Sequence, residues 1–144
     1  MEVFTLNIKN LTNNNRMITA TLGNFSVLEY GADLSLSPAS AQTGFFMSKM
    51  GVRRRQVIIN MDGKNSAVLQ AGAMQWMLGN IELSTNVKGV GDFMGKMFKG
   101  AVTKESAVKP EYRGVGTLAL EPTYKYIILQ DVSQWGSGMV IEDG

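Results

Sequence analysis

The 144-residue sequence contains no cysteine and no histidine, and its formal net charge is only +2. Without cysteine the chain has no disulfide, no thiolate nucleophile and no zinc–sulfur site. Without histidine it lacks the commonest metal ligand and the side chain that titrates nearest to neutral pH. These absences exclude Ser–His and Cys–His nucleophilic pairs, and we expect neither a bound metal nor another cofactor. Any acid–base catalysis would rest on carboxylates, lysines, tyrosines and hydroxyl groups.

Long apolar runs are missing as well, since none approaches the roughly 20 residues that a membrane-spanning helix needs. The N-terminal sequence MEVFTLNIKNL has neither the basic start nor the continuous apolar core of a signal peptide. We therefore expect a cytoplasmic protein. The small net charge gives no reason to expect nucleic-acid binding.

Apolar and polar residues alternate along many short segments, which is the pattern of strands with one buried face. The clearest runs are VFTLNIK (3–9), ADLSLSP (32–38), NIELST (80–85) and GTLALEP (116–122). Turn-forming residues stand between such runs, namely NNN (13–15), GN (23–24), YGAD (30–33), MDGKN (61–65), LGN (78–80) and EPT (121–123). The pattern predicts about nine to eleven strands in an all-β sandwich or barrel. We expect one domain, residues 1–144.

Two segments depart from this alternation. Residues 39–50 have no clear periodicity, and we expect a loop that leads into a strand. In NVKGVGDFMGKMFKGA (86–101) apolar residues recur at steps of three and four, which predicts a short helix or flap near 87–99 despite four glycines. Its apolar side chains are candidates for a contact between subunits; they are Val90, Phe93, Met94, Met97 and Phe98.

The segment AVLQAGAMQWML (67–78) reads as one strand that ends in a turn at Gly79-Asn80. Met74 and Trp76 would then share one face, with Gln75 on the other. A thioether metal site is disfavoured because no histidine partner exists, whereas methionine fills irregular core gaps well. Packing in the core is the favoured interpretation. A ligand cradle stays open, since both faces carry a glutamine that could orient a polar group.

Lys49, Arg53, Arg54 and Arg55 form the main basic feature of the sequence. In a strand, Arg53 and Arg55 would share one face and Arg54 would take the opposite face. Three arginines cannot all be buried, so this end of the strand must reach the rim of the fold or an interface. The favoured interpretation is a solvated rim with carboxylate partners on neighbouring strands. The alternative is an anion-binding or subunit-interface patch, because arginine suits bidentate recognition of carboxylate and phosphate.

Other candidate motifs are weaker. GVGDFMG (89–95) does not have the dinucleotide-binding spacing, MDGKN is a hairpin turn rather than a phosphate loop, and GVGTLAL (114–120) is the start of a bulged strand. Glu105 and Glu121 are the best carboxylates for acid–base catalysis, but nothing in the sequence brings them together. Stacking faces for nucleic-acid bases would come from Tyr112, Tyr124, Tyr126 and Trp135.

Several separated motifs resemble the bacterial AIM24 family, a group of unknown function. They are MGVRRRQVIIN (50–60), QAGAMQWMLGNIE (70–82), VKGVGDFMGK (87–96), VTKESAVKPEYRGVGTLALEPTYKYIIL (102–129) and QWGSGMVIEDG (134–144). The resemblance implies a double-stranded β-helix, or TRAP-like β-sandwich, similar to the tryptophan-sensing RNA-binding attenuation protein. It also implies that the chain is part of a longer protein, because members of the family are usually longer.

The resemblance brings no catalytic residues, since none are established for the family. Eukaryotic relatives are linked to the mitochondrial inner membrane, so peripheral membrane association is an expectation at the family level. For this chain we predict a non-enzymatic scaffold or interaction module that forms a homo-oligomer. The alternative is a module that binds a small ligand or RNA, although fold analogy alone is a weak reason for a function.

Overall fold

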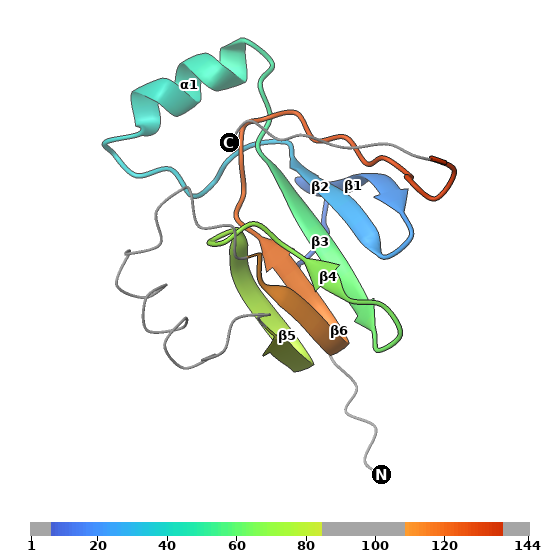
Figure 1. The fold of residues 1–144 in the computed structure, drawn as a ribbon. Helices are drawn as coiled ribbons and strands as arrows, with labels where there is room; N and C mark the ends of the chain where they lie inside the picture. The colour runs from blue at the N-terminus through green and yellow to red at the C-terminus, as the bar shows by residue number, and fades with distance from the viewer. Residues whose placement is uncertain (1–6, 85–108, 137–144) are drawn as a thin grey trace.

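The alternating segments build a curled antiparallel sheet, with one short helix beside it (Figure 1). The computed structural model describes residues 7–84 and 109–136. The elements in chain order are β1 (Arg16–Leu22), β2 (Phe25–Tyr30), α1 (Ala41–Lys49), β3 (Arg55–Asp62), β4 (Ala67–Val68), β5 (Met74–Ser84) and β6 (Glu111–Leu120). The all-β prediction is therefore confirmed. Nine to eleven strands were expected, and the described part of the chain contains six.

The sheet has the order β1-β2-β3-β6, and β6 is its most extensively paired strand. One edge of β6 pairs with β5 along its whole length. Its other edge pairs first with β4 and then with β3, both antiparallel. Because β3 and β4 run in the same direction along β6, MDGKN is not the hairpin turn that we predicted. It forms a loop between two strands on one line, with Gly63 at φ 78° and Asp62 Oδ1 accepting the backbone N–H of Lys64 at 2.9 Å.

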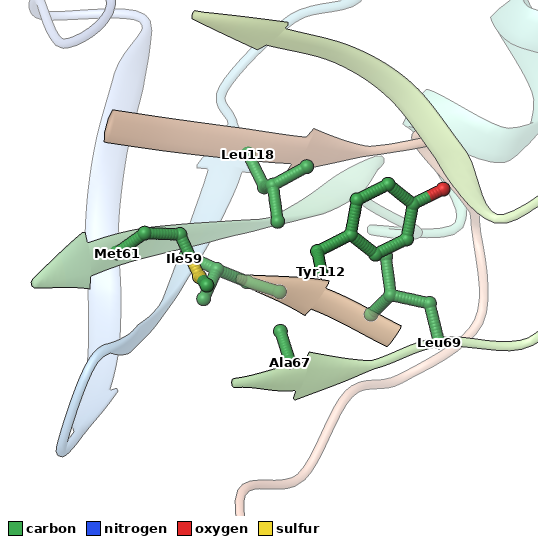
Figure 2. Close-up of a cluster of buried hydrophobic side chains, with 6 residues drawn as sticks. All are labelled: Ile59, Met61, Ala67, Leu69, Tyr112 and Leu118. Carbon is green, nitrogen blue, oxygen red and sulfur yellow. The ribbon is translucent and has the colours of Figure 1, made fainter. Parts of the chain in front are cut away.

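The two faces of the sheet carry separate apolar clusters. The larger cluster lies inside the curl, where side chains from β3, β4 and β6 point toward one another (Figure 2); its buried members are Ile59, Met61, Ala67, Leu69, Tyr112 and Leu118. The smaller cluster, on the opposite face, consists of Leu28, Ile58 and Ala119. Neighbouring residues of one strand contribute to different clusters, as the two-residue period requires.

Met74 and Trp76 both pack against these clusters, which confirms that they belong to the core. They do not share a face, however. The register of β5 against β6 shifts between them, so Met74 lies opposite Leu120 and Trp76 lies opposite Ala119. This β-bulge places Met74 on the inner cluster and Trp76 on the outer one.

The predicted strand at 67–78 is interrupted, and the predicted turn at Gly79-Asn80 is wrong. The chain turns instead at Gly72, which has a φ of 81°, between β4 and β5. β5 then continues through Gly79 and Asn80 to Ser84. Gly79 faces Gly116 in this ladder, so the glycine serves a close approach of two strands rather than a turn. β6 begins at Glu111, and its pairing with β5 stays in register across 114–116, so no bulge is found at the predicted position.

Residues 32–38 form a loop and not the predicted strand, and residues 41–49 of the segment expected to be a loop form α1. The alternating apolar residues of ADLSLSP do not form a buried face, since Leu34 is 83% exposed. The backbone N–H of Ser35 donates to Asp33 Oδ1 at 3.0 Å, which bends the chain locally. α1 stands apart from the sheet (Figure 1), and only its Gly44 is buried, so the helix has no apolar stripe for the sequence to reveal.

The predicted strands at 80–85 and 116–122 correspond to the ends of β5 and β6. The predicted strand at 3–9 and the predicted helix or flap near 87–99 lie largely or wholly outside the described residues. Within residues 7–84 and 109–136, no helix is long and apolar enough to cross a membrane.

Candidate functional site at the arginine-rich end of the sheet

The three arginines lie where the chain enters β3, and each contacts the segment that follows or ends β2. A guanidinium nitrogen of Arg53 donates to the carbonyl of Gly31. Arg54 Nη1 lies 2.8 Å from Asp33 Oδ2, and Arg55 Nη2 lies 2.7 Å from Glu29 Oε2. β3 begins only at Arg55, so the predicted strand pattern for the three side chains does not apply. The carboxylate partners are those of the favoured interpretation, although Asp33 stands in a loop rather than on a strand.

The segment after β6 docks on this arginine-rich end. Thr123 and Arg55 exchange two backbone hydrogen bonds, of 2.7 and 2.8 Å. Tyr124 and Tyr126 then stack near the guanidinium groups of Arg54 and Arg55, with Cζ-to-ring distances of 5.9 and 4.9 Å. Such cation–π contacts contribute about 0.5–1 kcal/mol at exposed sites. The arginine run thus holds the start of the C-terminal segment against β3.

Asp33 is the electrostatic centre of this arrangement. Its carboxylate accepts hydrogen bonds from Arg54, from the backbone of Ser35 and from the Tyr124 hydroxyl, the last at 3.1 Å. Burial alone would raise the pKa of Asp33, but these hydrogen bonds and the charge of Arg54 outweigh it and lower the pKa below 3.8. Burial and the Asp33 carboxylate raise the pKa of Tyr124 above 10.0. A cavity of about 300 Å³ adjoins these residues beneath α1.

We expect Asp33→Asn to destabilise the fold by about 1–2 kcal/mol at neutral pH, because it removes a charged hydrogen-bond acceptor. The pKa of Asp33 is lower in the folded state than in the unfolded state. Its carboxylate therefore contributes to the free energy of unfolding above the unfolded-state pKa near 3.8, and this contribution is lost as the pH falls from there through the folded-state pKa. Chemical denaturation of both proteins between pH 7 and pH 3 measures this difference. The gap in unfolding free energy should narrow below about pH 4. A gap of constant size down to pH 3 would contradict the assignment, and Tyr124→Phe should give a smaller loss.

Lys49 does not join the arginines in these contacts. It lies in the last turn of α1, and its Nζ is 5.5 Å from the ring centre of Phe45. The predicted four-residue anion patch is therefore divided between a helix end and the start of β3. Two of its arginines already face carboxylates, which reduces their availability for an anionic ligand.

A buried polar network on the outer face was not predicted from the sequence. Gln56 is 1% exposed, and its Nε2 donates to Leu120 O and to Gln75 Oε1, both at 2.8 Å. Its Oε1 accepts from the Tyr30 hydroxyl at 2.9 Å, and Arg16 Nη2 donates to that hydroxyl at 3.0 Å. Gln75 is one of the two glutamines considered for a ligand cradle, and its Oε1 accepts from the Gln56 side chain, so the ligand cradle stays a prediction. No sequence motif marks Gln56.

A second and larger cavity, of about 590 Å³, lies between the inner face of the sheet and the C-terminal segment. Figure 1 shows this segment, coloured orange to red, passing the β1–β2 hairpin. Buried residues of the inner cluster line the cavity, and they include Ile59, Met61 and Ala67. The volume falls within the range of about 300–1,000 Å³ that is usual for small-molecule sites.

The remaining predicted site residues are the aromatic stacking faces, the two carboxylates and the subunit contacts. Tyr112 is 2% exposed and cannot offer a stacking face, whereas Tyr126 is 78% and Trp135 44% exposed. Glu121 is exposed after β6, and Glu105 lies outside the described residues, as do the predicted subunit contacts Val90, Phe93, Met94, Met97 and Phe98. The part of the chain that the structure describes contains no group of three metal-ligating residues.

The comparison with protein families matches residues 47–144 to the family described as "Mitochondrial biogenesis AIM24". The chain belongs to the AIM24 family. The match includes β3 to β6, the arginine run and the docked C-terminal segment, and it leaves out the β1–β2 hairpin and most of α1. A comparison with curated proteins gives no match, and a comparison with solved structures gives none either. Similarity of this AIM24-family chain to the attenuation protein therefore stays a prediction.

Proposed function

We propose that this AIM24-family chain is a non-enzymatic scaffold or interaction module that self-associates through the free edge of β5. The supporting observation is the length of this edge. β5 has eleven residues, and among the described residues it pairs only with β6. A long, unprotected edge strand is a template for pairing with another chain.

The backbone geometry shows which groups of β5 are available. A Cβ added to Gly116 would lie 2.1 Å from Leu78 O, and one added to Gly114 would lie 2.0 Å from Asn80 O, so both carbonyls lie toward β6. Backbone groups of an antiparallel strand alternate in direction. The N–H and C=O groups of Met77, Gly79 and Ile81 therefore point to the free edge.

The side chains of β5 do little to prevent pairing. Natural edge strands are commonly protected by lysine, proline or a cluster of charges. β5 contains a single charged residue, Glu82, while Met77 is 46% and Leu78 40% exposed. Pairing with a second copy would cover this apolar surface and satisfy the backbone groups at once.

Met77→Lys tests the proposal by placing a charge on the free edge. Light scattering over a concentration series should show that the wild-type chain associates. The substitution should weaken association by about tenfold or more, because it sets a lysine against the approaching strand. Met50→Lys is the matched control, since Met50 is 75% exposed at the end of α1, away from the sheet. A monomeric wild-type chain at high concentration would overturn the proposal, and equal effects of both substitutions would exclude β5 as the interface.

Ligand binding is the second candidate function, and the 590 Å³ cavity favours a small molecule over RNA. RNA binding needs free cationic groups along a surface. Arg54, Arg55 and Arg113 each form an ion pair with a carboxylate within the described residues.

A further inference from the structure

The amide side chains that line the 590 Å³ cavity can offer hydrogen-bond acceptors to a ligand. Asn65 Nδ2 donates to Asp62 Oδ2 at 3.4 Å, and the Asn24 side chain also hydrogen-bonds to the Asp62 carboxylate. Gln130 Nε2 donates to the carbonyl of Asp131 at 3.2 Å. Each amide nitrogen has two N–H donors and uses one of them in these bonds, while the carbonyl oxygen can still accept a further hydrogen bond.

The described lining of the cavity carries a negative charge. Among the described residues that line the cavity, Asp131 is the one ionisable residue, and none is a lysine or an arginine. Hydrogen bonds from the side chain and the backbone of Ser133 lower the pKa of Asp131 below 3.8, so the carboxylate is ionised at neutral pH. Within this described lining, an anionic ligand would meet a like charge and have no cation to pair with.

The rest of the cavity is apolar. Ile59, Met61 and Ala67 form buried lining on the sheet side. Ile128 and Val132 line it from the C-terminal segment although they are 76% and 51% exposed. Those two side chains would gain burial if an apolar body filled the space between the segment and the sheet.

From this combination we infer that the cavity binds a small protonated amine with an apolar body. The ammonium group would donate to the carboxylate of Asp131 and to the free amide oxygens, while the apolar body would lie against Ile59 and Met61. This inference rests on the second candidate function, ligand binding, and is independent of self-association through β5. It names the chemical class of the ligand for that site.

A matched series of three probes tests the class: (naphthalen-1-yl)methylammonium, (naphthalen-1-yl)methanol and naphthalene-1-acetate. Calorimetric titration of the full chain should give the highest affinity for the ammonium probe and the lowest for the acetate. Asp131→Asn should remove the advantage of the ammonium probe over the alcohol, a change of about threefold for an exposed charge pair. Glu82→Gln is the control, because Glu82 is an exposed carboxylate on β5 outside the cavity.

Methionine-methyl spectra of the labelled protein locate the binding. The Met61 signal should shift with the ammonium probe, whereas the signal of Met50, which does not line the cavity, should stay unchanged. Ile128→Ser should weaken the binding of all three probes equally, because it removes an exposed apolar side chain from the lining and leaves the Asp131 carboxylate in place. Two results would overturn the assignment of an amine ligand without overturning ligand binding. One is equal affinity for the acetate and the ammonium probe, and the other is an Asp131→Asn variant that still prefers the ammonium probe to the alcohol. Absence of binding by every probe would overturn ligand binding itself, and the light-scattering result would be unaffected.

Discussion

Gly114→Ala should destabilise the fold by about 3 kcal/mol or more, the largest effect that we expect from a single added methyl group. The new Cβ would lie 2.0 Å from Asn80 O and 3.0 Å from the Cα of Ile81, both of them backbone atoms of β5. Neither can move without opening the longest ladder of the sheet. The residue also has a φ of 131°, which an L-residue with a side chain rarely adopts.

Chemical denaturation measures this effect, with Gly136→Ala as the matched control. Apart from its chain neighbours, no atom of the described residues lies within 4 Å of a Cβ built on Gly136, so we expect the unfolding free energy of Gly136→Ala to change by no more than about 0.5 kcal/mol. If Gly114→Ala proves too unstable to purify, the soluble yields of the two variants give the same ranking. Wild-type stability of Gly114→Ala would mean that β5 does not approach β6 as closely as described.

The sequence predicted the class of this fold better than its connections. Alternation in NIELST and GTLALEP identified parts of β5 and β6, because the alternate apolar residues of these two runs pack in the inner cluster. The same alternation in ADLSLSP predicted a strand that does not exist. Alternation with a period of two is a property of the local sequence. Whether a segment becomes a strand also depends on a neighbouring strand, which distant residues supply.

Glycine was the main source of wrong boundaries. Gly79-Asn80 has the composition of a turn, yet β5 passes straight through it because Gly116 lies opposite. The residue that does turn the chain is Gly72, within the stretch that we predicted to be continuous strand. A glycine permits both a turn and a close approach of strands, and only the partner strand decides between them.

The candidate site was predicted in part. The arginine run marks a real junction, and the carboxylate partners of Arg54 and Arg55 lie on or just after the neighbouring strand β2. The stacking of Tyr124 and Tyr126 on these arginines could not be foreseen, because about 70 residues separate the partners in the chain. The cavity between the sheet and the C-terminal segment also results from tertiary packing, so no local sequence motif predicts it.

Gln56→Met should cost about 3 kcal/mol, because it keeps the volume of the side chain and removes its hydrogen bonds. The Tyr30 hydroxyl and Leu120 O would each lose a partner in a part-buried setting. Arg16 makes the loss more severe, since its Nη2 contacts both Tyr30 and Gln56 and its Nε is already buried without a partner among the described residues.

Urea denaturation of Gln56→Met and of the control Gln70→Met measures this cost. Gln70 is exposed in the loop before β5, so its replacement should change the unfolding free energy by about 0.5 kcal/mol or less. A stable Gln56→Met protein would show that the apolar cluster of Leu28, Ile58 and Ala119 tolerates a thioether in place of the amide. The large loss that we expect would instead show that this face is fixed by one glutamine, which joins β1, β2, β5 and β6 through hydrogen bonds. Since β5 is held in part by Gln75, that loss should also weaken the edge through which we propose that the chain self-associates.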